Sequence, residues 1–145
     1  MPAELMREIY EIQGGNFDTA GEISGEIKII LRDLGIDAAN LRRVVVVAFE
    51  AEMNVVMYAR RGTLTFILTE NDVRLEIKDE GPGIPDLELA FQEGYTTASD
   101  ETRELGFGFG MGLPNMKKNS DELRIETDVG RGTSVFARIL LNAHE

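Results

Sequence analysis

Apolar and polar residues alternate along several short stretches of this chain, and each stretch predicts a β-strand. The first covers residues 6–13, and the next two, "TLTFILT" and "DVRLEIKD", are separated by the turn "END". The last two, "DELRIETD" and "TSVFARILL", flank the turn "VGRG". The sequence therefore predicts one strand near the amino terminus followed later by two hairpins.

Two longer stretches lie between the first strand and the first hairpin, and their patterns indicate helices. Asp18 predicts the cap of a helix that reaches Leu34, with Gly35 as its stop. Asp37 predicts the cap of a second helix, which ends at Gly62 and is apolar on almost every side.

Two short helices and a long loop separate the hairpins. Asp86 predicts the cap of a short helix through Gln92, and Pro114 suits the first turn of another. Residues 94–112 read as a loop of a length that is often functional. We therefore expect one α+β domain over residues 1–145, with helices layered on one face of a mostly antiparallel sheet.

Composition narrows the classes of function. The net charge is -11, from 26 acidic and 15 basic residues among 145, which argues against nucleic-acid or anionic-membrane partners. There is no cysteine, and we find neither a signal peptide nor a membrane span in the sequence. We expect a cytoplasmic protein.

Glu50 and Asn54 are the first candidates for chemistry. They are four residues apart on a helix whose other positions are mostly apolar, so they share one face. Such a pair is either internally hydrogen-bonded or open to water, or it faces a pocket as a metal and proton-transfer pair. Glu52 belongs to another face and is expected to be solvated.

Asp79 is the second candidate. It continues the inward row of Val73, Leu75 and Ile77, whereas Glu80 has the opposite parity and no predicted role. Asp beside Gly and Pro is common in turns. The parity instead favours a pocket carboxylate that accepts a donor such as the exocyclic amine of a nucleobase.

Two glycine-containing segments are weaker signals. In "GFGFGMG" a glycine stands at every second position, so successive backbone N–H groups are free to cradle an anion, although a flexible linker has the same look. In "GRGTSVFARI" the hydroxyl of Thr133 shares the inward parity of Val135, which is also ordinary hairpin chemistry.

Taken in order, "FEAEMN", "DEGPGIP", "GFGFGMGLPNM" and "GRGT" resemble the N, G1 and G2 boxes and the closing threonine of the GHKL ATPases. Within that superfamily the chain is similar to the anti-sigma-factor serine/threonine kinases of bacterial partner switching, and most of all to the switch kinases. The resemblance covers roughly residues 40 to 140. It implies the Bergerat ATP-binding fold, a two-layer α/β sandwich.

The resemblance also implies roles. Asn54 would coordinate Mg²⁺ on the ATP phosphates, and Asp79 would bind the adenine amino group. Glu50 would be the general base or would position the attacking hydroxyl. The other matched positions are Gly81 and Gly83 at the adenine wall, Thr133 in support of Asp79 or of an adenine-bound water, and the lid glycines Gly106, Gly108, Gly110 and Gly112. The lid, about residues 94–112, departs from the pattern in lacking an arginine before its final glycines, and Arg103 is a candidate substitute.

The implied function is an ATP- and Mg²⁺-dependent protein serine/threonine kinase that phosphorylates a small STAS-domain-like regulator. The alternative is an ATP-binding module that sequesters a sigma factor or another regulator of transcription with little phosphotransfer. An isolated histidine-kinase catalytic domain is disfavoured, because no phospho-acceptor histidine helix is present. Glu50 favours the kinase, since a pure binder needs no base. The sequence leaves the oligomeric state open, although the family often forms dimers and a homodimer is therefore one candidate.

Overall fold

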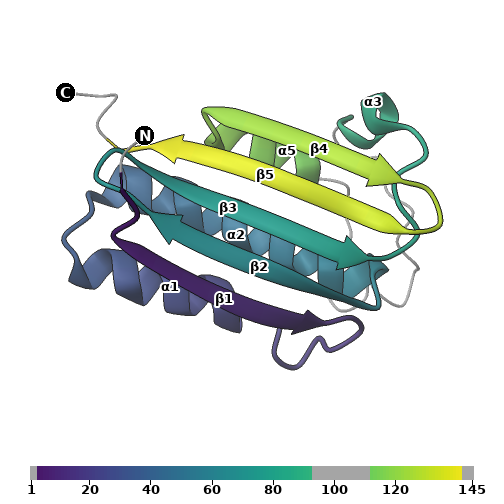
Figure 1. Cartoon of the computed structure of the whole chain (residues 1–145), viewed down its shortest axis with the longest axis horizontal. Helices are drawn as coiled ribbons and strands as arrows, with labels where there is room; N and C mark the ends of the chain where they lie inside the picture. The colour runs from purple at the N-terminus through teal and green to yellow at the C-terminus, as the bar shows by residue number, and fades with distance from the viewer. Residues whose placement is uncertain (1–2, 93–111, 142–145) are drawn as a thin grey trace.

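A five-stranded antiparallel sheet forms one layer of the protein (Figure 1). The computed structural model describes residues 3–92 and 112–141. Its strands are β1 (Met6–Gln13), β2 (Arg61–Leu68), β3 (Asp72–Glu80), β4 (Glu122–Asp128) and β5 (Gly132–Leu140). Their spatial order is β1-β2-β3-β5-β4, and every neighbouring pair is antiparallel. The first strand and both hairpins are as the alternation predicts.

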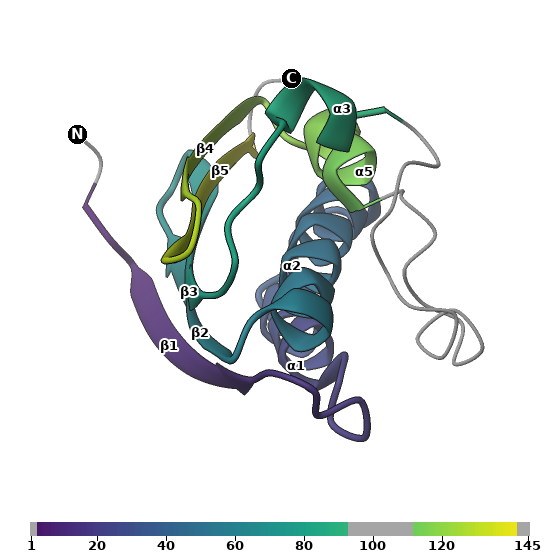
Figure 2. The ribbon, with the colours of Figure 1, turned by 90° about the vertical axis from the view of Figure 1, so that its right-hand side faces the viewer.

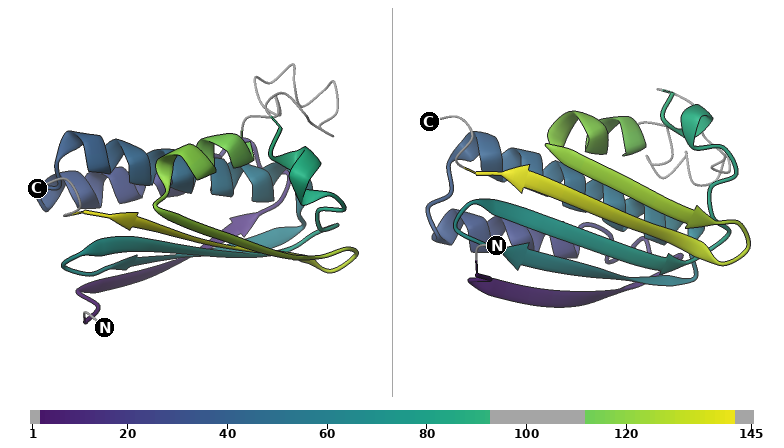
Figure 3. Two further views of the ribbon diagram at one scale, coloured as in Figure 1. Left: turned by 90° about the horizontal axis from the view of Figure 1, so that it is seen from above. Right: turned by 45° about the horizontal axis from the view of Figure 1, so that its top comes forward.

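Helices form the second layer. They are α1 (Glu22–Asp33), α2 (Ala38–Tyr58), α3 (Leu87–Ala90) and α5 (Gly112–Asn119). The long helices and α5 cover one face of the sheet, and no described helix covers the other (Figures 2 and 3). This arrangement confirms the predicted α+β fold. In the ranges that the structure describes, no helix is long and apolar enough to cross a membrane.

The core lies between the two layers, because each central strand turns alternate side chains toward the helices. On β3 the inward residues Val73, Leu75 and Ile77 are at most 2% exposed. Phe66 of β2 and Ile139 of β5 are fully buried beside them. Burial of each such side chain stabilises the fold by about 1.5–3 kcal/mol. The inward row of β3 therefore ends in a firmly packed layer, with Asp79 as its next member.

The predicted caps of α2 and α3 are confirmed. Asp37 accepts a hydrogen bond from the Asn40 backbone N–H at 3.1 Å, and Asp86 accepts one from the Leu89 N–H at 3.1 Å. The predicted end of α2 was wrong, since the helix ends at Tyr58. After Ala59 and Arg60 the chain enters β2, where Gly62 pairs with Asp79. Strand pairing takes these residues from the helix.

The predicted start of α1 was also wrong. The helix begins at Glu22, after Gly21, whose φ of +96° suits glycine, and no side chain of its own segment caps it. The carboxylate of Glu52 takes that place, accepting hydrogen bonds from the N–H groups of Gly21 at 3.0 Å and Ser24 at 3.2 Å. Glu52 is 2% exposed, so the expectation that it is solvated was wrong. The face of α2 opposite Glu50 packs against α1 and not against water.

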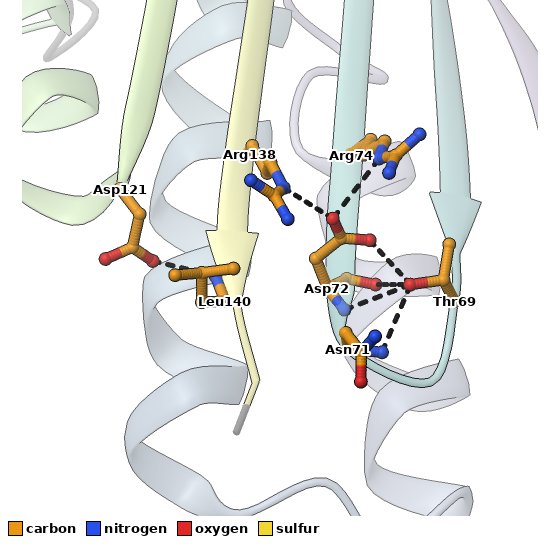
Figure 4. Close-up of polar contacts among 7 residues, drawn as sticks. All are labelled: Thr69, Asn71, Asp72, Arg74, Asp121, Arg138 and Leu140. Atoms are coloured by element: carbon orange, nitrogen blue, oxygen red, sulfur yellow. Dashed lines mark hydrogen bonds and ion pairs between the residues drawn. The ribbon is translucent and has the colours of Figure 1, made fainter. Parts of the chain in front are cut away.

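A polar cluster closes the sheet at the β2–β3 turn (Figure 4). Asp72 is fully buried and accepts hydrogen bonds from Thr69 Oγ1 at 2.6 Å, Arg138 Nε at 2.5 Å and Arg74 Nε at 3.2 Å. Desolvation alone would raise the pKa of Asp72, but the hydrogen bonds from Thr69, Arg138 and Arg74 hold that pKa below its ordinary value. The cluster ties β3 to β5 and to the turn.

Candidate nucleotide-binding site

The carboxyl-terminal half of α2 brings Glu50 and Asn54 to the first residue of α5. A Cβ placed on Gly112 would lie 3.2 Å from Asn54 Oδ1 and 3.4 Å from Glu50 Oε2. Because Gly112 has no side chain, the amino end of α5 approaches both groups closely. Helix amino termini attract anions through their unpaired N–H groups. The predicted pair therefore faces an anion-attracting helix end.

Glu50 is half-buried, and its electrostatic state follows from that position. Desolvation raises its pKa above the ordinary value, and a hydrogen bond with the Asn115 side chain partly opposes the rise. A raised pKa suits a carboxylate that takes a proton during a reaction. Asn115 was not predicted, because an amide in a short helix carries no signal by itself.

Asp79 lies at the end of the inward row of β3, as its parity predicts. Its carboxylate is half-buried and accepts the backbone N–H of Thr133 at 3.0 Å. Desolvation raises the pKa of Asp79, and the Thr133 hydrogen bond only partly opposes this. A carboxylate has about four acceptor positions. Within the described ranges Thr133 supplies the one hydrogen bond that this carboxylate accepts, which leaves room for a ligand donor.

Thr133 contacts Asp79 through its main chain, and its hydroxyl has another partner. The hydroxyl lies 3.0 Å from that of Thr127 on β4. Thr127 Oγ1 also accepts the N–H of Ile84 at 2.8 Å. Thr133 therefore lies close to Asp79. Its inward hydroxyl, however, contacts Thr127, which in turn accepts a hydrogen bond from Ile84 in the loop after β3. Thr127 was missed, because a threonine on an edge strand has no distinctive pattern.

The loop after Asp79 is held by the β4–β5 turn. Gly81 N–H donates to the Arg131 carbonyl at 3.2 Å, and Gly130 N–H donates to the Pro82 carbonyl at 2.9 Å. Gly83 has a φ of +76°, and a Cβ there would lie 2.7 Å from the Asp128 carbonyl oxygen. This glycine is thus required both by its backbone conformation and by the close approach of the turn.

The two parts of the site meet at the last turns of α2. Asp79 pairs with Gly62 across the sheet, and a Cβ on Gly62 would lie 3.0 Å from Val55, the residue after Asn54. A Cβ on Gly81 would lie 3.1 Å from Ala59. One helix thus carries the Glu50–Asn54 pair and packs against the strand and loop that present Asp79.

The predicted lid cannot be placed, because most of it lies outside the described residues. This applies to Gly106, Gly108, Gly110 and the candidate lid arginine, Arg103. In the part of the chain that the structure describes, no three His, Cys, Asp or Glu side chains group in a way that could hold a metal ion. A metal at Asn54 would therefore take its other ligands from phosphates and water, as Mg²⁺ commonly does.

An α+β domain with an under-partnered carboxylate, and with a polar pair at a helix amino end, has the features of a nucleotide-binding protein. The family described as "Histidine kinase-, DNA gyrase B-, and HSP90-like ATPase" matches residues 36–143. The chain belongs to this family of ATPases. ATP is accordingly the ligand that the family implies for the site.

Individual relatives narrow the comparison. The serine/threonine-protein kinase RsbT of Bacillus subtilis is 26% identical over 112 residues, which are 74% of this chain and 78% of that one. An anti-sigma F factor of Caldanaerobacter subterraneus is 35% identical over 91 residues, which are 59% of this chain and 60% of that one. The chain thus resembles one relative named as a kinase and one named as an anti-sigma factor.

Two solved structures share the fold. The SiaB–SiaC complex from Pseudomonas aeruginosa matches with a TM-score of 0.62 at 15% identity, covering 94% of this chain and 91% of that one. The RsbU and RsbW domains of Rv1364c from Mycobacterium tuberculosis match with a TM-score of 0.58 at 15% identity, covering 92% of this chain and 32% of that one. At this identity they support the architecture alone.

Proposed function

We propose that the protein is an ATP- and Mg²⁺-dependent serine/threonine kinase whose substrate is a small STAS-domain-like regulatory protein. The observation that carries this proposal is the position of Glu50 beside Asn54 at the amino end of α5. A base at the phosphate end of the site is useful to a transferase and unnecessary to a pure nucleotide binder. The likeness to a relative named as a serine/threonine-protein kinase supports the same reading.

The described residues offer binding partners for both ends of an ATP molecule. The open acceptor positions of Asp79 would receive the exocyclic amine of adenine, beside Gly81 and Gly83. The N–H groups at the start of α5 would receive phosphate oxygens, with Asn54 as the protein ligand of Mg²⁺. ATP supplies the phosphoryl group, and Mg²⁺ neutralises the charge on its oxygens. In this proposal the described residues would contact opposite ends of one ligand.

Glu50 would act on the substrate hydroxyl. The serine or threonine oxygen attacks the γ-phosphorus while the bond from that phosphorus to the bridging oxygen of ADP breaks. Glu50 orients the hydroxyl and accepts its proton on a carboxylate oxygen. The desolvation that raises its pKa makes this carboxylate a better proton acceptor than an exposed glutamate.

A second function is favoured by the relatives that are named anti-sigma factors. In that case the protein would bind ATP and hold a sigma factor, with little or no phosphotransfer. The site residues would then set nucleotide affinity, and Glu50 would have no chemical step to perform. Dimer formation is compatible with both functions, and sedimentation of the full chain would measure it.

The test is incubation with γ-labelled ATP and Mg²⁺, together with each purified STAS-domain protein and sigma factor of the source genome. We expect label on one STAS-domain protein. Glu50→Gln should abolish that transfer while changing ATP affinity by less than about threefold, because the base acts mainly in the transition state. The matched control is Glu122→Gln, which neutralises an exposed carboxylate at the start of β4, at the other end of the sheet from Asp79.

Three outcomes separate the alternatives. Transfer by Glu50→Gln at the rate of the unchanged protein would remove Glu50 from the role of base. Tight ATP binding and sigma-factor binding without transfer to any candidate would select the anti-sigma module. Absence of ATP binding would overturn both functions.

A further inference from the structure

An open pocket lies beside the proposed nucleotide site at the same end of the sheet. Its volume is about 370 Å³. Its walls come from the end of α2, the loop after β3 and the β4–β5 turn, which Figure 1 shows at one end of the sheet. The residues used below are Tyr58, Arg60, Glu80, Pro82 and Arg131. Of the residues that line this pocket, only Gly81 has a place in the proposed nucleotide site, at the adenine wall.

The charges around this pocket leave a positive excess, although the chain as a whole carries a net charge of -11. Arg61 pairs with Glu80, and Arg131 lies 3.6 Å from Asp128. Arg60 is close enough to Glu80 to lower the pKa of that carboxyl further, but the hydrogen bonds of Glu80 go to Arg61. In residues 3–92 and 112–141, no hydrogen bond or ion pair is made by the Arg60 side chain. An anionic group is therefore the ligand that this pocket favours.

The shape and the side chains indicate a protein as the source of that anion. Small-molecule sites usually enclose most of the ligand surface, whereas this pocket is open. Tyr58 is 37% exposed and stands with two arginines at its walls. Exposed Tyr and Arg are the residues most often found at the energetic centre of protein interfaces. Guanidinium groups bind carboxylates through paired hydrogen bonds.

We propose that this pocket receives an acidic side chain of a protein partner. The proposal takes from the proposed function only that such a partner exists. Its position is informative, because Gly81 and Pro82 exchange hydrogen bonds with Arg131 and Gly130. A side chain bound here contacts the turn that holds the loop after Asp79. The partner would thus dock on the outside of a loop whose other neighbour is the nucleotide.

The test is an NMR titration of the ¹⁵N-labelled full chain with the peptide acetyl-Gly-Glu-Glu-Gly-amide, with its Gln-Gln counterpart as control. We expect saturable shifts of the amides of Tyr58, Arg60, Gly81 and Gly130 with the Glu peptide alone. Arg60→Ala and Arg131→Ala should each weaken binding about two- to fivefold, the range of exposed ion pairs. The matched control is Arg42→Ala, which removes an exposed arginine from the other end of α2 and should leave the affinity unchanged.

Several results would overturn the proposal. These are shifts spread over the whole surface, absence of shifts up to the solubility limit of the peptide, equal binding of the Gln peptide, and equal weakening by Arg42→Ala. Tighter binding of inorganic phosphate at the same amides would replace the protein carboxylate with a small anion. ATP affinity is measured separately on the unchanged protein and on Arg60→Ala. If the unchanged protein does not bind ATP, the proposed function is overturned, whereas the proposal for this pocket is not affected.

Discussion

Two aspartates of the same strand, Asp72 at the start of β3 and Asp79 near its end, lie in opposite electrostatic settings. Asp72 is fully buried, and three side chains donate hydrogen bonds to it. Asp79 is half-buried and receives one backbone N–H within the described residues. The pKa of Asp72 is lowered and that of Asp79 is raised. Within the described residues, one strand therefore carries a carboxylate with three side-chain donors at one end and a carboxylate with a single backbone donor at the other.

The number of hydrogen bonds that each carboxylate accepts distinguishes a structural aspartate from a candidate ligand-binding one. Buried polar groups are nearly always paired, so a satisfied carboxylate needs no ligand to explain it. A carboxylate that is desolvated but under-partnered costs stability, and such groups gather at binding sites. We infer that Asp72 stabilises the sheet and that the carboxylate of Asp79 has acceptor positions available for a nucleotide.

The largest effect should come from Asp72→Asn. The change leaves Arg74 and Arg138 without their anion, and the free energy of unfolding should fall by about 2 to 3 kcal/mol. Urea unfolding measures this loss. ATP affinity of the folded fraction should stay within about twofold of the unchanged protein. If the Asp72→Asn protein has normal stability, Asp72 does not have the structural role that the comparison gives it.

Asp79→Asn should have the reverse profile. The amide cannot offer the same charged acceptor to adenine, and ATP affinity should fall about ten- to 150-fold, the range for a hydrogen bond to a charged group. Urea unfolding should show little loss of stability. The affinity is measured by calorimetry with a non-hydrolysable ATP analogue, and unchanged affinity would remove Asp79 from the adenine role.

A smaller effect should appear in the pH dependence of stability. The lowered pKa of Asp72 contributes stability that is present above its unfolded pKa of about 3.9 and is lost as the pH falls through the folded value. The raised pKa of Asp79 has the opposite sign, so its contribution falls as the pH rises from about 3.9 through its folded value.

Urea unfolding between about pH 3 and pH 7 tests both signs, since this range brackets the ordinary aspartate pKa. The deficit of Asp72→Asn should shrink toward low pH. The stability of Asp79→Asn relative to the unchanged protein should increase toward neutral pH. Parallel curves for all three proteins would show that neither carboxylate has a perturbed pKa.

The smallest effect should come from Glu80→Gln. Glu80 neighbours Asp79 in sequence but is exposed and pairs with Arg61. Exposed ion pairs contribute little, so ATP affinity should stay within about twofold and the urea midpoint should not move measurably. A loss as large as that of Asp79→Asn would show that the comparison depends on total charge and not on the direction of the side chain.

Much of the fold could be predicted, because alternation fixes which side chains of a strand face inward. Residues 6–13 form the predicted strand, and Asp79 continues the inward row. The end of α2 could not be predicted, since Arg61 and Gly62 are compatible with a helix until their strand partners Glu80 and Asp79 are known. Local patterns do not contain partners that lie far away in the sequence.

In the candidate site, the roles of Glu50, Asn54 and Asp79 stay predictions, and the residues that support them were missed. Glu50, Asn54 and Asp79 stood out because each is polar where its neighbours are apolar. Glu52 was misplaced, because the face opposite Glu50 was taken for the solvent side. That face contacts α1, whose amino end Glu52 caps. The lid glycines Gly106, Gly108 and Gly110 stay a prediction.

The β4–β5 turn has a practical consequence for anyone who wishes to label this protein. Hairpin tips with exposed glycine and arginine are usual places for tags, reporter loops or chain breaks. Here a Cβ on Gly132 would lie 2.0 Å from the backbone oxygen of Asp79, and the same turn holds the Pro82 carbonyl. A tag in this turn would shift the loop after Asp79 and so disturb the proposed nucleotide site, although the turn itself lies outside that site. The β2–β3 turn is no better, because Asp72 anchors it. The connection at Gly35 is open, since a Cβ there would meet no atom within 4 Å, but its φ of +78° favours glycine, so a reporter would be inserted beside Gly35 and not in place of it.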